Sequence, residues 1–381
     1  MLRCNILSIF LAFSLLAGAQ DWKVVRENPQ KAFPKTVAAG NYSGIAHLHD
    51  DIYAVVSDKS DSALYFNFRI LVNPKTGELE QVENLGFTER TDGTLNDGKP
   101  WQGQEKGFDH EAIVKVSDST LVIASEGYCR LKEYPILPTS ADAAKVGSSQ
   151  NLWESRWPSS EFYPNYNFES LAFDFVRQYL WTIPESTLRK DGQPATPQNG
   201  LANQLRLMRL DWGKMKENRN KEEYSEQVSS KKDSRYMTPY AYQMDQPSTH
   251  KKADIYVMGV SELCALPDGQ LLVLEREAFI PKIKIGAFCK CKLYQINPLN
   301  SEEFSMKENF SSDTPFLKKR LLAEWKTGLS LSKRSFANYE GMCLGPKLED
   351  GSQVVILLSD SQDQYAGVLK DWFKTIVIRK E

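Results

Sequence analysis

Ten polar positions recur in pairs along the chain, and their types and spacing could support acid–base or metal chemistry. Nine of the ten are carboxylates, and the two members of a pair lie 13 to 20 residues apart. The pairs are Ser43 with Asp58, Glu111 with Glu126, Glu169 with Glu185, Glu262 with Glu275, and Glu340 with Asp360. Carboxylates that gather at one place raise one another's pKa, because like charges at close range oppose ionisation. Such a set needs bound cations, basic neighbours or retained protons.

A hard divalent cation is one way to balance these charges. Calcium binds about six to eight oxygen atoms, mainly from carboxylates and carbonyls. Calcium is therefore the expected cofactor, and its candidate ligands are Asp58, Glu126, Glu169, Glu185, Glu262, Glu275, Glu340 and Asp360. A metal held in this way could polarise an ester and activate a water molecule.

Two adjacent residues are candidates for the catalytic step, and two others are candidates for substrate binding. Glu111 could act as a ligand or base, and His110 directly precedes it in a chain with only four histidines. Arg276 and Lys59 each follow an acid of the set and could bind an anionic group. A single acid at a strand end more often binds backbone N–H groups, but nine in register favour a shared site. The expected substrate is a small anionic or ester compound.

The paired residues belong to a sequence unit that occurs five times. Its consensus is Asn, an aromatic residue, Glu, a small residue and an apolar residue, followed by two short strands and a final acid. The units are Asn41–Asp58, Asp109–Glu126, Asn167–Glu185, Gly259–Glu275 and Asn338–Asp360. Turn residues such as Pro267-Asp268-Gly269 predict that each unit is a β-hairpin. The start of the first strand then lies beside the end of the second, so both members of a pair meet.

Two more strand candidates follow the hairpins in most units. Examples are 63–71 with 78–85, 205–210 with 237–244, and 292–296 with 320–325. The second hairpin strands are apolar on both faces, which is typical of sheets that stack face to face. Four strands per repeated unit predict an all-β fold, a β-propeller with four-stranded blades.

The number of blades and the closure of the ring depend on the less regular parts of the chain. We count five repeats, and six blades is the alternative count if residues 137–164 form a degenerate blade. The segments Trp22–Arg26 and Phe373–Ile378 are expected to complete the last blade together. A β-sandwich or barrel with long insertions is the alternative fold, but it would not explain the repeated acids.

The first 19 residues are predicted to be a secretory signal peptide. An 11-residue uncharged run, Ile6–Leu16, precedes the small-residue site Ala17-Gly18-Ala19. That run is too short for a stable transmembrane helix, and no other apolar run is long enough to cross a membrane. Residues 20–381 then form one propeller domain with a charged insertion at about 213–236. We expect export to the periplasm or the extracellular space.

The composition is that of a globular protein and excludes some partners. The chain is 41% hydrophobic and 25% charged, and its net charge of -2 argues against a nucleic-acid surface. Cleavage of the signal peptide would leave five cysteines, so at least one is unpaired within the chain. Cys289 and Cys291 form a C-x-C without a second pair, so buried apolar packing is the favoured role of the cysteines.

Short strings within the five units occur in a fixed order and resemble those of a known family. They are Ser43-Gly-Ile-Ala46, His110-Glu-Ala-Ile113, Ser125-Glu126, Asn167-Phe-Glu-Ser-Leu-Ala172, Ser261-Glu-Leu263, Leu272-Val-Leu-Glu-Arg276, Asn338-Tyr-Glu-Gly-Met342 and Ser359-Asp360. As an ordered set from Tyr42 to Asp360, they resemble the bacterial phytase-like family, described as having esterase-like activity of phytase. The resemblance implies an exported propeller and the hydrolysis of phosphate or carboxylate esters. Ala112 and Ser170 stand where the family commonly has glycine.

Two functions of different classes follow from these observations. The first is a metal-dependent ester or phosphoester hydrolase that acts at a carboxylate-lined funnel. The alternative is a non-catalytic propeller that binds a sugar, a lipid or a protein there, using aromatic residues of the loops Trp101–Phe108 and Trp153–Tyr166. Carboxylates that converge on one point favour metal chemistry, whereas carboxylates paired with arginine or backbone N–H groups favour binding or structure.

Overall fold

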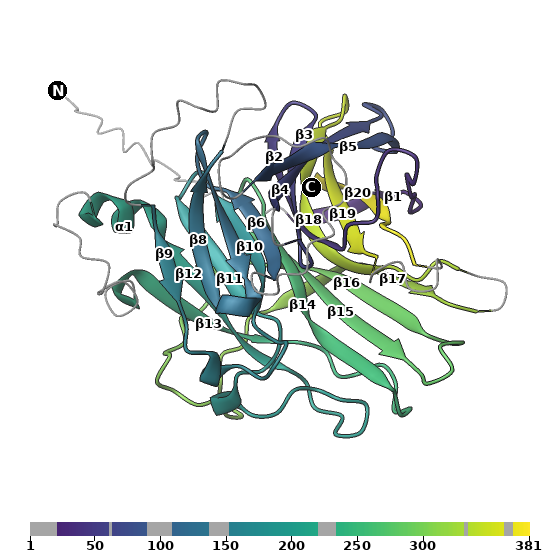
Figure 1. Cartoon of the computed structure of the whole chain (residues 1–381). Coiled ribbons are helices and arrows are strands. Elements are labelled where there is room, and N and C mark those ends of the chain that lie inside the picture. Colours follow the sequence, from purple (N-terminus) through teal and green to yellow (C-terminus); the bar gives the residue numbers. More distant parts are fainter. Residues whose placement is uncertain are drawn as a thin grey trace, which may run out of the picture.

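The chain forms five four-stranded antiparallel sheets that are arranged as the blades of a propeller (Figure 1). The computed structural model describes residues 21–60, 63–89, 109–136, 152–219, 234–330, 334–361 and 369–381. Within these residues the prediction of an all-β propeller with four-stranded blades is confirmed, and the sheets number five.

The blades follow the chain in order, and the strands of each blade run from the innermost one outward. The first blade contains β2 (Tyr42–His49), β3 (Ile52–Ser57), β4 (Ala63–Val72) and β5 (Leu79–Glu89). The second contains β6 (His110–Lys115), β7 (Thr120–Ser125), β8 (Arg130–Pro135) and β9 (Glu154–Arg156). The third contains β10 (Phe168–Asp174), β11 (Tyr179–Pro184), β12 (Gln204–Asp211) and β13 (Met237–Gln243).

The last two blades complete the ring. The fourth contains β14 (Ile255–Ala265), β15 (Leu271–Ile280), β16 (Phe288–Ile296) and β17 (Lys319–Gly328). The fifth contains β18 (Asn338–Lys347), β19 (Gln353–Asp360), β20 (Phe373–Lys380) and, as its outer strand, β1 (Trp22–Glu27). Trp22 lies opposite Lys380, so the two ends of the chain complete one blade, as the sequence predicted.

The five repeated hairpins are the two inner strands of each blade. The innermost strands β2, β6, β10, β14 and β18 contact one another in turn, and β18 contacts β2. Five apolar clusters also follow this order, because each joins two neighbouring blades. The strands β3 and β19 are buried along their whole length, since the blades cover both of their faces. The ring of blades is therefore closed by packing between neighbours.

The irregular segments add little to this ring. Residues 154–156 supply the outer strand of the second blade, while residues 137–151, part of the candidate sixth blade, lie outside the described residues. The predicted charged insertion begins with helix α1 (Trp212–Arg219), and residues 220–233 also lie outside. Short 3-10 turns occur at Glu126–Tyr128, Ser159–Glu161, Arg189–Asp191, Ser234–Tyr236 and Pro298–Asn300.

Two further expectations concern membranes and cysteines. In the part of the chain that the structure describes, no helix has both the length and the apolar character needed to span a bilayer. Cys129, Cys264, Cys289, Cys291 and Cys343 are all free and buried. Their role as small apolar residues of the core agrees with the interpretation of the sequence.

Candidate functional site

The predicted polar positions lie where the innermost strands begin and the neighbouring strands end. The cross-strand register places His110 opposite Ser125 and Asn338 opposite Asp360. The pairing of each innermost strand with its neighbour is irregular at or beside the first acid or serine of the unit. A bulge of this kind redirects a side chain away from the regular alternation of a strand. The repeated bulges therefore occur at the positions from which carboxylates of different blades meet.

Arg276 of β15 is the centre of one group of carboxylates, which we call the arginine group. Its guanidinium donates hydrogen bonds to Glu169, at 3.2 Å, and to Glu185 and Glu340. The side chain of Arg276 is 3% exposed, and it also donates to Asn338 Oδ1 at 3.2 Å. One arginine of the fourth blade thus neutralises acids of the third and fifth blades. Its predicted role in substrate binding stays a prediction.

The acids of the arginine group hold protons more tightly than free carboxyls do. Burial raises the pKa of Glu169 well above its usual range, and the neighbouring Glu185 raises it further. Burial also raises the pKa of Glu185, although Arg276 and a hydrogen bond with Glu169 lower it. Two carboxyls can share a hydrogen bond only if one of them is protonated. Burial raises the pKa of Glu340 to about 7 despite the opposing effect of Arg276.

A second group, which we call the acidic cluster, consists of Asp58, Asp109 and Glu111. One carboxylate oxygen from each lies within 4.8 Å of the other two. Burial raises the pKa of Glu111 well above its usual range, and the charge of Asp58 adds to this effect. Lys59 Nζ lies 2.7 Å from Asp58. Burial lowers the pKa of Lys59, but the acids around it outweigh burial, so this pKa is raised. Three converging carboxylates are suitable ligands for a hard cation.

Asp109 is a member of the acidic cluster that the sequence reasoning missed. It lies two residues before Glu111, at the place where other units have Asn41 and Asn167. Asp109 and Asn41 have φ values of 50° and 47°, in the left-handed region that Asp and Asn tolerate better than most residues. The replacement of the repeated asparagine by an aspartate was the signal that could have identified it.

Glu126 is influenced by the charges of both the acidic cluster and the arginine group. Burial raises its pKa to about 7, the charge of Glu185 adds to the effect, and a hydrogen bond from the Asn167 backbone opposes it. That bond joins Asn167 N to Glu126 Oε1 at 3.1 Å and so connects the second and third blades. The predicted role of Glu126 as a metal ligand stays a prediction.

Two of the predicted ligands have other partners. Glu262 is 1% exposed and accepts hydrogen bonds from the backbone of Leu171 at 2.9 Å and of Leu263 at 3.0 Å. Glu275 accepts hydrogen bonds from the Tyr242 hydroxyl and from Lys319, both at 2.7 Å. The structure thus brings Asp58 and Glu111 together, and separately Glu169, Glu185 and Glu340, but it gives Glu262 and Glu275 separate surroundings.

The remaining candidates are buried at the ends of inner strands. Asp360 is 4% exposed at the end of β19, opposite Asn338. His110 is 1% exposed, and its carbonyl accepts a 2.6 Å hydrogen bond from the Ser43 hydroxyl. This bond joins the first and second blades at the start of their innermost strands. The catalytic role of His110 stays a prediction.

Three of the aromatic residues proposed for ligand binding pack against other aromatic side chains, whereas the Tyr163 hydroxyl donates an exposed 2.8 Å hydrogen bond to the Gly192 carbonyl. Trp153 is fully buried and makes an edge contact with Trp212 at a centroid distance of 5.2 Å. Trp157 and Phe162 both pack against Phe168. These contacts place them between the second and third blades. The loop Trp101–Phe108 lies outside the described residues.

We expect the raised pKa values to make the fold more stable in mild acid than at neutral pH. Glu126 and Glu340 have folded-state pKa values of about 7, above the ordinary 4.5, so the folded protein holds protons that the unfolded chain releases. Stability should then fall as the pH rises from about 4.5 through 7. We expect the melting temperature to fall by several degrees over this range in the presence of a chelator. Glu126→Gln should flatten the profile, and a melting temperature that rises with pH would contradict the expectation.

The comparisons with known proteins identify a family. Residues 37–362 match the phytase-like family, described as "Esterase-like activity of phytase". No curated protein matches the chain. Among solved structures, a member of the DUF4221 family from Bacteroides vulgatus is similar, with 8% sequence identity and a TM-score of 0.34 over 95% of this chain and 100% of that chain. That score is too low to carry an argument. The family match spans all five repeated hairpins, and the chain belongs to the phytase-like family.

Proposed function

We propose that the protein is an exported, metal-dependent hydrolase of ester or phosphoester bonds. The observation that carries the proposal is the acidic cluster, in which carboxylate oxygens of Asp58, Asp109 and Glu111 lie within 4.8 Å of one another. Membership of a family named for esterase-like activity supports the same reaction class. Export is proposed from the predicted signal peptide at residues 1–19.

The acidic cluster has the chemistry to hold a cation. Asp58 and Asp109 would be ligands, and the hard oxygen donors favour calcium or a similar divalent ion. Bound there, such an ion would polarise the substrate oxygen and favour the ionised form of Glu111. Burial and the neighbouring Asp58 raise the pKa of Glu111, and this supports the proposal, because a buried carboxyl beside other carboxyls needs a cation or a proton.

Glu111 would act as the general base in the proposed reaction. Its carboxylate would take a proton from water while the water oxygen bonds to the carbonyl carbon or the phosphorus atom. The ester bond to the leaving oxygen then breaks, and the proton passes to that oxygen. The Lys59 ammonium is positioned beside Asp58, and its side chain is 59% exposed, so a substrate could reach it. His110 would be the further acid or base.

The second candidate function is a binding propeller without catalysis. It is favoured by the arginine group, whose carboxylates are paired with Arg276 and are not free for a metal. Assays of 4-nitrophenyl acetate and 4-nitrophenyl phosphate, with and without calcium, separate the two functions. Turnover of either compound above the buffer rate supports the hydrolase. Folded, calcium-treated protein that hydrolyses neither would favour the binding propeller.

Calcium should stabilise the protein through the acidic cluster. At about 100 times its dissociation constant, a ligand adds roughly 2.7 kcal/mol, so we expect the melting temperature to rise by several degrees. A chelator should reverse this rise, and Asp109→Asn should abolish it. The control is Asp50→Asn, because Asp50 has a similar φ of 46° and a side chain that is 89% exposed. Melting curves that do not respond to calcium or chelator would disprove the metal site.

A further inference from the structure

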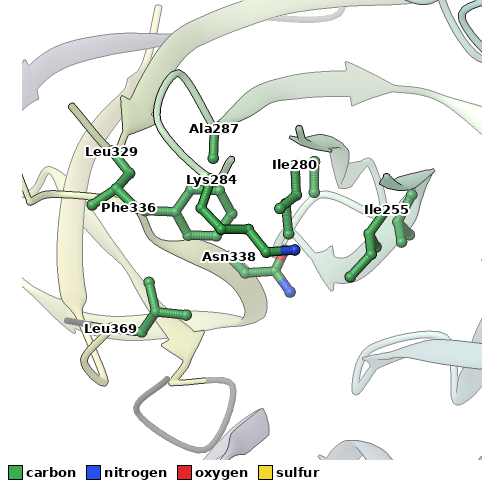
Figure 2. Close-up of a pocket in the computed structure, with 10 residues that line it drawn as sticks. Ile255, Ile280, Lys284, Ala287, Leu329, Phe336, Asn338 and Leu369 are labelled. Atoms are coloured by element: carbon green, nitrogen blue, oxygen red, sulfur yellow. The ribbon is translucent and has the colours of Figure 1, made fainter. Parts of the chain in front are cut away.

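A pocket of about 230 Å³ lies where β14 begins and β15 ends (Figure 2). Its walls are mainly apolar and include Ile255, Ala278, Ile280, Ala287, Leu329 and Phe336. Figure 2 shows Phe336, Leu329 and Leu369 on one side and Ile255 and Ile280 on the other, with Lys284 extending between them. The size and apolar walls suit a short hydrocarbon chain.

Asn338 connects this pocket to the candidate site. The side chain lines the pocket, and its Nδ2 donates a 2.6 Å hydrogen bond to Glu340. Its Oδ1 accepts the 3.2 Å hydrogen bond from Arg276. A molecule in the pocket would therefore touch a residue that is itself bonded to the arginine group. β18, which carries Glu340, packs against β2, and the repeated unit of β2 ends at Asp58 of the acidic cluster.

Large apolar side chains in the pocket wall and in the adjoining loop are exposed to solvent. Ile255 at the start of β14 is 50% exposed, and Ile283 and Ile285 in the loop after β15 are 74% and 49% exposed. The two loop isoleucines flank Lys284, which lines the pocket and is held by Asp254 at 3.3 Å. Apolar residues gathered at the edge of a pocket are typical of a surface that contacts an apolar ligand.

The charge of the neighbouring site argues for a ligand without negative charge. The acidic cluster, Glu126 and the arginine group contain seven carboxyls, and Lys59 and Arg276 each bond to members of this set. Arg276 is already bonded to three of these carboxyls. A phosphate group would need a positive partner that Arg276 cannot supply while it is bonded to these acids, whereas an uncharged carbonyl needs none.

We propose that the pocket binds the apolar acyl chain of an uncharged carboxylic ester, whose carbonyl then faces the acidic site. This inference rests on the proposed hydrolase function and names its substrate class. In the reaction, a water oxygen bonds to the carbonyl carbon and the acyl C–O bond breaks. The alkoxide takes up the proton that the water loses, and the products are a carboxylic acid and an alcohol.

The first test compares 4-nitrophenyl esters of acetate, butyrate, hexanoate and octanoate below their aggregation limits. Each methylene that enters the pocket should raise kcat/KM roughly threefold to fourfold, mainly through KM, until the pocket is filled. Ala278→Leu and Ala287→Leu should occupy the pocket and remove about tenfold or more of the gain in kcat/KM of octanoate over acetate. The control is Val176→Leu, because Val176 is 74% exposed and lies outside the pocket. It should leave the gain of octanoate over acetate unchanged.

A binding measurement separates this inference from the hydrolase function. Calorimetry should show that 2-octanone, an uncharged ketone with no bond to hydrolyse, binds roughly 10²-fold more tightly than 2-butanone. Ala278→Leu should abolish that difference. If the acetate ester is hydrolysed, but kcat/KM does not rise with chain length and 2-octanone does not bind, the pocket assignment is wrong and the hydrolase function stands. If 2-octanone binds but no ester is hydrolysed, the hydrolase function and the ester assignment are wrong. Faster turnover of 4-nitrophenyl phosphate than of the octanoate ester would overturn the uncharged substrate.

Discussion

Arg276→Met should lower the free energy of unfolding by about 3–5 kcal/mol near pH 7.5, the usual loss when a buried ion pair loses one partner. The arginine is 3% exposed and is bonded to Glu169, Glu185 and Glu340. Methionine fills much of the same volume but leaves these carboxyls without a counter-charge. We expect urea unfolding curves to show a much lower midpoint with a similar slope.

The pH dependence of this variant gives a second readout. Protonated carboxyls need no counter-charge, so near pH 5 Arg276→Met should recover a large part of the lost stability. The control is Arg379→Met, because Arg379 is 46% exposed and pairs with Asp350 at the surface. That change should cost no more than about 1 kcal/mol. Equal unfolding midpoints for Arg276→Met and the wild type near pH 7.5 would show that the arginine does not hold the group together.

Glu111→Gln should reduce turnover of an aryl ester or phosphoester by about 10²-fold or more, the usual scale for a general base. The amide keeps the size of the side chain but cannot accept the proton of water. Because Glu111 is 9% exposed and its pKa is raised by burial, the variant should fold at least as well as the wild type. Steady-state rates at saturating calcium, with melting curves of the same samples, test both statements.

The control for this variant is Glu349→Gln, the same chemical change in the exposed turn between β18 and β19. It should leave the rate unchanged. Calcium affinity should be measured in parallel, because Glu111 lies within the acidic cluster. A Glu111→Gln protein that keeps more than about half of the wild-type rate would exclude Glu111 as the base.

The repeated unit alone was enough to predict the blades. Hairpins depend on local features, such as the turn at Pro267-Asp268-Gly269 and strands that are apolar on both faces, and these features are visible in the sequence. The same reasoning predicted that Trp22–Arg26 and Phe373–Ile378 share a blade, because a closed ring leaves one sheet to be completed by both ends. The fold class was therefore determined by patterns that repeat at short range.

The sequence also showed that carboxylates would crowd at one end of the inner strands, but the tertiary structure decided which of them meet. Glu275 and Arg276 are neighbours in β15, and consecutive side chains of a strand point to opposite faces. The pairing of β14 with β15 also shifts register between Val260 and Glu262. In the folded protein Arg276, and not Glu275, bonds to acids of the other blades. Asp109 belongs to the acidic cluster, and its backbone adopts the left-handed conformation directly before β6. This local geometry could not be predicted from the repeat.

What the sequence by itself determined is the repeat, the number of hairpins and the excess of acids near the axis, because each depends on residues close together in the chain. Only the tertiary structure decided that the acids divide into an acidic cluster and an arginine group, since this depends on bulges and on contacts between blades. The apolar pocket was likewise set by packing, because its walls come from the fourth and fifth blades and their loops, from Ile255 to Leu369. Contacts between residues this distant in sequence leave no periodic signal that a reading of one chain can detect.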